Sequence, residues 1–588
     1  MRKETSPEAP GRRRFLGQVS GAAAASIATN AIGLPALSLL TEASTQADIG
    51  PQNAGQRRRT AKHIRDRATE DEFLIPPHTH TDNGDEQKYP NRIGNFTKTL
   101  RHDPSTGEVD PAAYVTLTEA IASGDSADFD ALAINGHFGC PDPSRQRRLV
   151  NPMAGYAFDL EGADSHVPAM RPAPAFASAE EAGEMVELYW MALLRDVNFE
   201  DYATNPLAQA AAADLSSLSD FRGPKQGGHV TPQTLFRDSF PGCTRGPYIS
   251  QFLLQPADFG AQRVDQRIRT NAPGIDFMTT FSDWLDVQNG CNETARITPG
   301  LLVFCRNGRD LSQYVHIDVL FQAYFVALLV LLGGGYPVDA GNPYGVIIDG
   351  GAGRPRNASL DPNGSISQVG FGTFGGPAIA TLLAEPATRA LKHVWYQKWL
   401  VHRRLRPEEF GGRVEVHRLG RASYPVHSDL ITVSTVLNGV FSSFGSYLLP
   451  MAFPEGSPNH PSYGAGHATV AGACVTILKA FFNESAPIQN PVVPNASGSG
   501  VVPYTGRALT VGGELNKLAS NVAQGRNIAG VHWRTDATES LKLGEECAIS
   551  ILRDMSHLYR ETFNGFSLRK FDGTSVTVSG PEDSREDE

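Results

Sequence analysis

Three segments in the C-terminal third of the chain place basic side chains, histidines and glycines at spacings that could bind an oxyanion. The first reads NHPSYGAGHAT over residues 459–469, and the apolar run VAGACVTILKAFF follows it at once. Gly464 and Gly466 allow turn conformations and a close approach of the backbone to a ligand. A helix that begins near His467 would present free N–H groups and a positive dipole end. This segment predicts an oxyanion cradle, although alone it fits a glycine turn before a buried helix equally well.

The second segment, KWLVHRRLRP, begins at Lys398 and supplies cationic side chains. On one continuous helix, Lys398 and Arg406 would lie about 80° apart around the axis and about 12 Å apart along it, too far to bind one small ion. The following proline disfavours the α conformation of Arg406, so we expect the helix to end near Leu405 and Arg406 to fold back. We interpret Arg403 and Arg404 as a solvent-exposed or interface face. The alternative for the whole segment is a basic helix C-terminus that complements the dipole.

The third segment, RNIAGVHWRTD, begins at Arg526. His532 and Asp536 lie four residues apart, which is one helical turn. The carboxylate can therefore hold one imidazole nitrogen and leave the other free as a ligand or nucleophile. Arg526 precedes the break at Gly530 and adds a planar, always charged donor. A histidine and an aspartate at this spacing are otherwise usually a helix-surface contact.

Together the segments read Lys-x7-Arg-Pro, His-Pro-Ser-Tyr-Gly-Ala-Gly-His and Arg-x5-His-x3-Asp, in that order. This combination resembles the vanadium-dependent haloperoxidases, which share an oxyanion site with a group of acid phosphatases. The resemblance includes the motifs FGTFGGP and HRRLRPE and is strongest over residues 369–549. The seven-residue gap between Lys398 and Arg406, and the histidine at His460, match the bromoperoxidase branch.

The resemblance implies a vanadate cofactor and its binding residues. Lys398, Arg406 and Arg526 would neutralise the vanadate oxygens, and the N–H of Gly466 would donate to one of them. His532 would bind vanadium directly through an imidazole nitrogen. The residues implied for the cofactor thus come from all three segments.

The resemblance also implies the catalytic residues. His467 would be the acid/base group where peroxide enters, Lys398 would polarise the peroxide, and His460 is the third catalytic candidate. One departure is Ala465, where the family usually has serine. A hydrogen bond to a charged group typically contributes about 1.5–3 kcal/mol, so we expect weaker vanadate retention or slower turnover.

The function that this resemblance implies is oxidation of bromide and iodide by hydrogen peroxide to hypohalous acid, which halogenates small organic acceptors. The first alternative is an acid phosphatase with His532 as nucleophile and His467 as general acid. The second is an exported oxyanion-binding protein without turnover. Related bromoperoxidases form homo-oligomers from dimers to dodecamers, so self-association is expected. A net charge of −11 argues against a nucleic-acid partner.

The hydrophobic periodicity predicts a mainly α protein: a helical-bundle core with long loops and few short strands. Helical patterns cover residues 179–198, 276–290, 311–332, 377–405, 428–449, 467–482, 514–530 and 535–560. Strand patterns cover residues 344–348 and 575–579. We divide the chain into an export signal (1–47), an extended N-terminal arm (48–110), one α-helical domain (111–580) with its active site in 390–540, and a disordered acidic tail (581–588).

The N-terminal sequence GRRRFLG, followed by a small-residue apolar stretch over 19–40, resembles a twin-arginine export signal. The alternative is a basic tail before a membrane anchor. We expect an exported protein, periplasmic or extracellular, without a stable membrane span in the mature chain. A second apolar run, over 319–332, is 14 residues long and too short to cross a bilayer, so we expect a buried helix.

The six cysteines show no metal-ligand spacing, and one or two disulfides are compatible with an oxidising compartment. Cys474 and Cys547 lie in helical patterns and are expected to be buried. Residues 361–365, DPNGS, could bind a structural calcium ion, but they lack the acidic density of a calcium loop and fit an ordinary asparagine turn better. His78 and His80 resemble a metal-binding pair but are expected to face solvent.

Overall fold

The computed structural model describes residues 53–293, 299–345, 365 and 367–579. Its contacts divide the chain after Asp71 into a small N-terminal unit and a large unit that begins at Glu72. The large unit is mainly α-helical, and the strands of the described residues form only two-stranded antiparallel sheets. The prediction of a mainly α fold with few short strands is confirmed.

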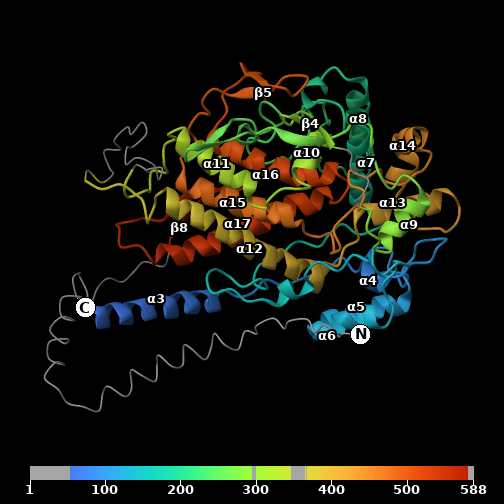
Figure 1. Cartoon of the computed structure of the whole chain (residues 1–588), viewed down its shortest axis with the longest axis horizontal. Coiled ribbons are helices and arrows are strands. Elements are labelled where there is room, and N and C mark those ends of the chain that lie inside the picture. Colours follow the sequence, from blue (N-terminus) through green and yellow to red (C-terminus); the bar gives the residue numbers. More distant parts are fainter. Residues whose placement is uncertain (1–52, 294–298, 346–364, 366, 580–588) are drawn as a thin grey trace, which may run out of the picture. The chain divides into compact units, whose positions relative to one another are not determined.

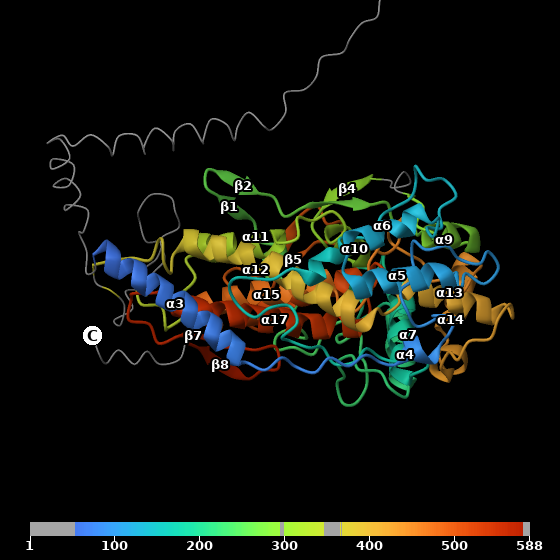
Figure 2. The same cartoon turned by 90° about the horizontal axis from the view of Figure 1, so that it is seen from below.

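Four helices make the centre of the large unit: α12 (Gly376–Tyr396), α15 (Gly466–Phe481), α16 (Val511–Ile528) and α17 (Arg534–Ser556). Figures 1 and 2 show them side by side, with α15 in contact with the other three. Every residue of α15 except His467 is buried. A Cβ on Gly472 would collide with the carbonyl of Leu541 on α17, so glycine at this position allows the two helices to pack closely.

The remaining elements surround this bundle. The other helices of the large unit are α4 (Asp85–Lys88), α5 (Pro111–Ser123), α6 (Ser126–Ile134), α7 (Ala179–Leu193), α8 (Pro206–Ser217), α9 (Phe281–Gln288), α10 (Gly308–Tyr314), α11 (Gln322–Gly333), α13 (Pro407–Arg418) and α14 (Val436–Phe444). The strand pairs are β1 (Ala257–Phe259) with β2 (Gln262–Val264), β3 (Ile268–Asn271) with β4 (Pro299–Val303), β5 (Val492–Pro494) with β6 (Val501–Pro503), and β7 (Phe566–Arg569) with β8 (Ser575–Val578).

The predicted helices that carry the site are found within a few residues of their expected bounds, but three predicted helices are interrupted. The pattern over 428–449 becomes a π-helical turn, Asp429–Val433, followed by α14. The pattern over 311–332 is divided between α10 and α11, and a non-helical turn connects them. The pattern over 377–405 becomes α12 followed by a π-helical turn, Gln397–His402. The prediction missed α13, although its N-terminal proline and the acidic residues of its first turn are typical of a helix start.

Of the two predicted strands, one is found, and the described residues of the other do not form a strand. The predicted strand over 575–579 is β8, whereas Tyr344 and Gly345 lie outside the strands and 346–348 lie outside the described residues. The apolar run over 319–332 lies mostly in α11, whose residues are largely buried, as expected. Within the described residues, every helix is too short or too polar to span a bilayer.

The extended arm expected over 48–110 is replaced by folded structure. It contains α3 (Ala54–Leu74), a helix without buried residues. Ion pairs one helical turn apart, such as Lys62 with Asp66, support an exposed helix of this kind. Farther along, residues 93–100 are buried in the large unit, including the apolar Ile93, Phe96 and Leu100. The expected export signal and acidic tail lie outside the described residues.

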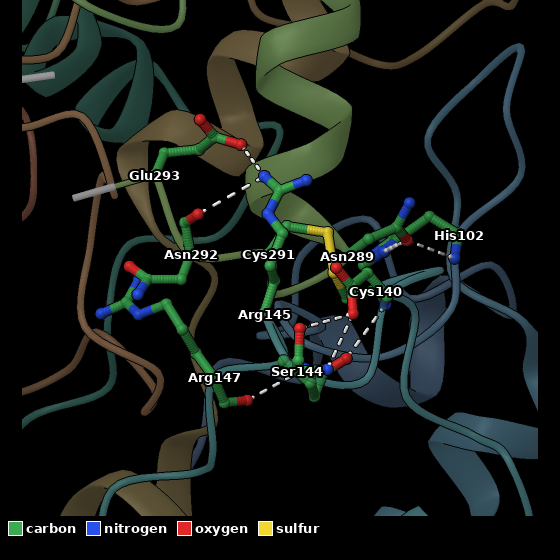
Figure 3. Close-up of a disulfide and its surroundings, with 11 residues drawn as sticks. His102, Cys140, Ser144, Arg145, Arg147, Asn289, Cys291, Asn292 and Glu293 are labelled. Atoms are coloured by element: carbon green, nitrogen blue, oxygen red, sulfur yellow. Dashed lines mark hydrogen bonds and ion pairs between the residues drawn. A yellow bond between two sulfur atoms is a disulfide. The ribbon is translucent and has the colours of Figure 1, made fainter. Parts of the chain in front are cut away.

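One disulfide joins Cys140 to Cys291, with 5.1 Å between their Cα atoms (Figure 3). A single disulfide agrees with the one or two that the six cysteines allowed. It attaches the loop before Arg147 to the residues that follow α9. Cys474 and Cys547 are buried free thiols, as expected from their helical patterns.

Candidate active site

His532 lies just before α17, and its neighbouring turn orients the imidazole. Asp536 Oδ2 accepts a hydrogen bond from His532 Nδ1 at 2.8 Å, as the spacing predicted. The other ring nitrogen, Nε2, lies 3.1 Å from Nη1 of Arg406. Burial, and then the charge of Arg406, hold the pKa of His532 well below its usual value. The imidazole therefore stays neutral, with a lone pair on Nε2 that can bind a metal centre.

Lys398 and Arg406 approach each other because the helix between them is broken. Lys398 lies in the π-helical turn, and Arg403 at its end has a left-handed backbone with a φ of 43°. Arg406 is extended, with φ −83° and ψ 156°, and Pro407 begins α13. The prediction that the proline would move Arg406 out of the α region is confirmed, although the helix ends at His402, earlier than expected.

The three predicted cations are buried and donate only to uncharged groups. Lys398 donates to the carbonyls of Pro461 at 2.7 Å and Ser462 at 2.9 Å, and also to that of Gly464. Arg406 donates to the carbonyl of Val531 at 2.8 Å.

Arg526 completes this set from α16. It donates to the carbonyl of Val315 at 2.6 Å, and its Nε has no hydrogen-bond partner among the described residues. No carboxylate of the described chain lies within 4.0 Å of a nitrogen of any of the three cations. Burial lowers the pKa values of Arg406 and Arg526 to about 10, and burial followed by Arg406 lowers that of Lys398 well below its usual value.

Arg404, unlike these three cations, has carboxylate partners. Its burial shows that the interpretation of Arg404 as part of a solvent-exposed face was wrong. Its guanidinium is buried and pairs with Glu181, Glu184 and Asp536. Although burial opposes its charge, these carboxylates raise the pKa of Arg404 above its usual value. Arg404 is buried because the turn after α12 directs it toward α7, which the local sequence does not show. Asp536 acts on Lys398 and Arg406, and Asp318 acts on Arg526, only from beyond contact distance. A buried charge is stabilised most by a counter-charge in direct contact, so the site favours a bound anion.

The N-terminus of α15 adds uncharged donors to this cationic site. The N–H groups of Gly466, His467 and Ala468 have no acceptor within the described residues. A Cβ on Gly466 would lie 3.2 Å from the ring of Trp395, so a larger residue would fit tightly. These free donors and the positive end of the helix dipole agree with the predicted oxyanion cradle.

His467 and His460 occupy different positions at the site. The side chain of His467 is 20% exposed, and its Nε2 lies 3.0 Å from Oδ1 of Asp318. His460 is buried; its Nδ1 lies 2.8 Å from Nη2 of Arg406, and its ring centroid lies 4.7 Å from that of Trp395. Burial, followed by Arg526, lowers the pKa of His467, and Asp318 partly opposes this shift.

Sequence reasoning missed Asp318, Glu181 and Glu184. Asp318 lies in the turn between α10 and α11, where the sequence predicted one continuous helix. An aspartate beside an otherwise apolar run was the available signal for that break. The two glutamates lie on α7, far from the motifs in sequence, and only the fold brings them to Arg404.

The minor candidate sites do not join this centre. His78 has a side chain that is 62% exposed, and His80 Nε2 contacts the carbonyl of His166 at 2.9 Å. The described part of the chain has no cluster of three or more histidine, cysteine, aspartate or glutamate side chains that could hold a metal ion. Of the calcium candidate, residues 361–364 lie outside the described residues.

The residues that converge here fit vanadate. An oxyanion with pentavalent vanadium needs cationic partners for its oxygens and one neutral imidazole nitrogen for the metal. Lys398, Arg406 and Arg526 offer the cations, and the neutral His532 offers Nε2. The free N–H groups at the start of α15 offer further donors. The chemistry of this donor set matches an anion and not a bare metal cation.

Comparisons with known proteins show the family of the chain. The family model described as VCPO second helical-bundle domain matches residues 433–561. A vanadium-dependent bromoperoxidase of Corallina pilulifera is 37% identical over 563 residues, which cover 83% of this chain and 91% of the relative. A vanadium-dependent bromoperoxidase of Ascophyllum nodosum is 33% identical over 510 residues, which cover 82% of this chain and 88% of the relative.

The solved structure of the homohexameric second vanadate-dependent bromoperoxidase of Ascophyllum nodosum is similar in fold. Its TM-score is 0.82 at 30% sequence identity, and the match covers 90% of this chain and 92% of that one. The similarity thus extends over most of both chains, and the residues that the family model matches include the segments around His467 and His532. On this evidence, the chain belongs to the vanadium-dependent bromoperoxidases.

Proposed function

We propose that the chain uses vanadate to oxidise bromide and iodide with hydrogen peroxide, and that the hypohalous acid formed halogenates small organic molecules. The observation that carries this proposal is the group of three buried cations without a carboxylate in contact, one of which, Arg406, lies 3.1 Å from Nε2 of His532. The relatives support vanadate as the anion, because they are vanadium-dependent bromoperoxidases.

The cofactor would be held by residues of all three segments. Lys398, Arg406 and Arg526 neutralise the vanadate oxygens, and the N–H of Gly466 donates to one of them. Nε2 of His532 binds the vanadium, while Asp536 keeps the proton on Nδ1. Because no carboxylate of the described residues lies within 4.0 Å of these cations, a bound anion would give them their only direct counter-charge.

Bound vanadate supplies Lewis-acid activation of hydrogen peroxide without a change in its oxidation state. His467 accepts a proton from the entering peroxide and returns a proton to the departing water. The ammonium group of Lys398 polarises the oxygen that the halide attacks. His460 orients Arg406 through the contact at Nη2. One hydrogen peroxide, one bromide and one proton give one hypobromous acid and one water.

The test is peroxide-dependent bromination of a phenolic dye by purified protein, first depleted of vanadate and then titrated with it. We expect little bromination before vanadate is added, saturable recovery afterwards, and competition by inorganic phosphate. His532→Ala should lose the recovery, whereas His229→Ala, at an exposed position, should retain it. Bromination at full rate in the vanadate-depleted wild type would contradict the proposal.

We also propose that the protein assembles as a homo-oligomer, which the homohexameric state of the similar solved structure supports. Export by a twin-arginine-type signal remains a proposal that rests on the N-terminal sequence. Light scattering after size-exclusion chromatography would measure the assembly. Cell fractionation of a variant with Arg12 and Arg13 replaced by lysine would measure export, and unchanged export would contradict it.

A further inference from the structure

The peptide between Gly464 and Ala465 lies at the centre of the anion cradle, and both of its polar groups are bound. Its carbonyl, on Gly464, accepts from the ammonium group of Lys398. Its N–H, on Ala465, donates to Oγ of Ser540 at 2.8 Å. The two groups of a planar peptide point in opposite directions, so these contacts fix its orientation from both sides.

Ser540 approaches this peptide from another helix. It lies on α17, and its side chain has no exposed surface. A Cβ on Gly464 would overlap Oγ of Ser540, so only glycine allows this approach. The serine hydroxyl and the glycine are therefore matched to each other across the interface of α15 and α17.

The side chain of residue 465 offers the turn no anchor of its own. Ala465 is the N-cap residue of α15, and its side chain cannot cap the helix. Serine or threonine at an N-cap commonly anchors such a turn by accepting from a backbone N–H of the first helical turn. With alanine, the donors of Gly466, His467 and Ala468 stay free, but the turn loses its local side-chain anchor.

We propose that Ser540 is a positioning residue for the vanadate site: it holds the Gly464–Ala465 peptide so that Lys398 and the free N–H groups of α15 face the anion. This inference rests on the proposed function. Without the Ser540 hydroxyl, the N–H of Ala465 would be buried without an acceptor, and the peptide could rotate toward the site. Rotation would remove the Gly464 carbonyl from Lys398 and misalign the cradle.

The experiment compares Ser540→Ala with Ser550→Ala in the full-length protein. Ser550 is a matched control: it is also buried on α17, and its Oγ also accepts from a backbone N–H, that of Ala163, at 3.0 Å. Ten residues separate the two serines on α17, which places the control about 15 Å away along the helix. Each substitution removes one buried hydroxyl that accepts a hydrogen bond from one backbone N–H.

The readouts are the Kd for vanadate by equilibrium dialysis, the thermal midpoint without vanadate, and kcat at saturating vanadate. Both variants should lower the thermal midpoint by a similar amount. Only Ser540→Ala should raise the Kd for vanadate, by about threefold to tenfold, as expected for one hydrogen bond. Its kcat should recover toward the wild-type value when vanadate saturates the site.

Three results would overturn the inference. The first is a Kd for vanadate in Ser540→Ala equal to that of a wild type that binds vanadate. The second is a Kd for vanadate in Ser550→Ala raised as much as in Ser540→Ala. If Ser540→Ala does not fold, Ser540→Cys keeps a polar group at this position but replaces the hydroxyl by a slightly larger and weaker acceptor. A wild-type Kd in that variant would be the third result. A wild type that neither binds vanadate nor brominates would instead overturn the proposed function itself.

Discussion

The contact between Asp318 and His467 predicts a specific change in the pH dependence of bromination. Oδ1 of Asp318 lies 3.0 Å from Nε2 of His467. Burial and Arg526 lower the pKa of His467, and the Asp318 carboxylate raises it. Asp318→Asn keeps the shape of the side chain but removes its charge. The pKa of His467 should therefore fall further below its usual value.

The size of this change follows from the contact. A hydrogen bond to a charged group contributes about 1.5–3 kcal/mol, and one pKa unit corresponds to about 1.4 kcal/mol. The upper part of that range is too large here, because the side chain of His467 is 20% exposed and solvent screens the interaction. We expect the pKa to fall by about one unit.

The sign is set by the role of the imidazole as a base. The unprotonated form of His467 accepts the proton of peroxide, so a lower pKa moves the acidic limb of kcat/KM for hydrogen peroxide to lower pH by about one unit. The rate on the plateau should fall as well, because a less basic imidazole accepts the proton less readily.

The assay is a pH profile of kcat/KM for hydrogen peroxide at saturating vanadate and bromide. Asp258→Asn is the control, because it removes the same charge from an exposed position on β1 and should leave the profile unchanged. An acidic limb that stays in place in Asp318→Asn, or that moves to higher pH, would refute the assignment of His467 as the base under the influence of Asp318.

Three further predictions concern the anion and the disulfide. Ala465→Ser should tighten vanadate binding about tenfold or more by adding a hydroxyl donor; weaker binding in dialysis would mean that the hydroxyl caps α15 instead. Arg526→Met removes a buried cation without a carboxylate partner, so it should raise the thermal midpoint of vanadate-free protein by about 2–5 °C while weakening vanadate binding. A lower midpoint in scanning calorimetry would argue against charge repulsion in the empty cage. Cys291→Ser opens the disulfide to Cys140, whose partners are 151 residues apart, and the chain-entropy model sets an upper bound of about 5 kcal/mol on the stability lost. Bromination at 25 °C should persist, and an unchanged midpoint would show that the disulfide does not stabilise the fold.

The residues of the site could be predicted because they are local signals in three short segments. The one-turn spacing of His532 and Asp536 sets their contact whatever the rest of the fold does. The proline after Arg406 likewise restricts the backbone of its neighbour by a steric clash within two residues. Glycines before His467 indicated the start of α15 for the same local reason.

The ion-pair partners of the site residues could not be predicted, because burial and contacts between distant segments select them. Arg404 and Arg406 are chemically identical and two residues apart, yet Arg404 pairs with Glu181 on α7 and Arg406 pairs with no carboxylate of the described residues. Asp318 was missed because the apolar pattern over 311–332 predicts one continuous helix, and the contact of Asp318 with His467 depends on the packing of distant segments.

By itself, the amino-acid sequence determined which side chains could bind an oxyanion, the mainly helical fold, and the family. Side-chain chemistry, periodicity and steric limits act over a few residues, and the chain carries them in any conformation. Tertiary structure alone decided which cations stay without a counter-charge, where Asp318 meets His467, and that Ser540 reaches Ala465. These outcomes depend on which surfaces are removed from water together, and that is settled only when distant helices pack.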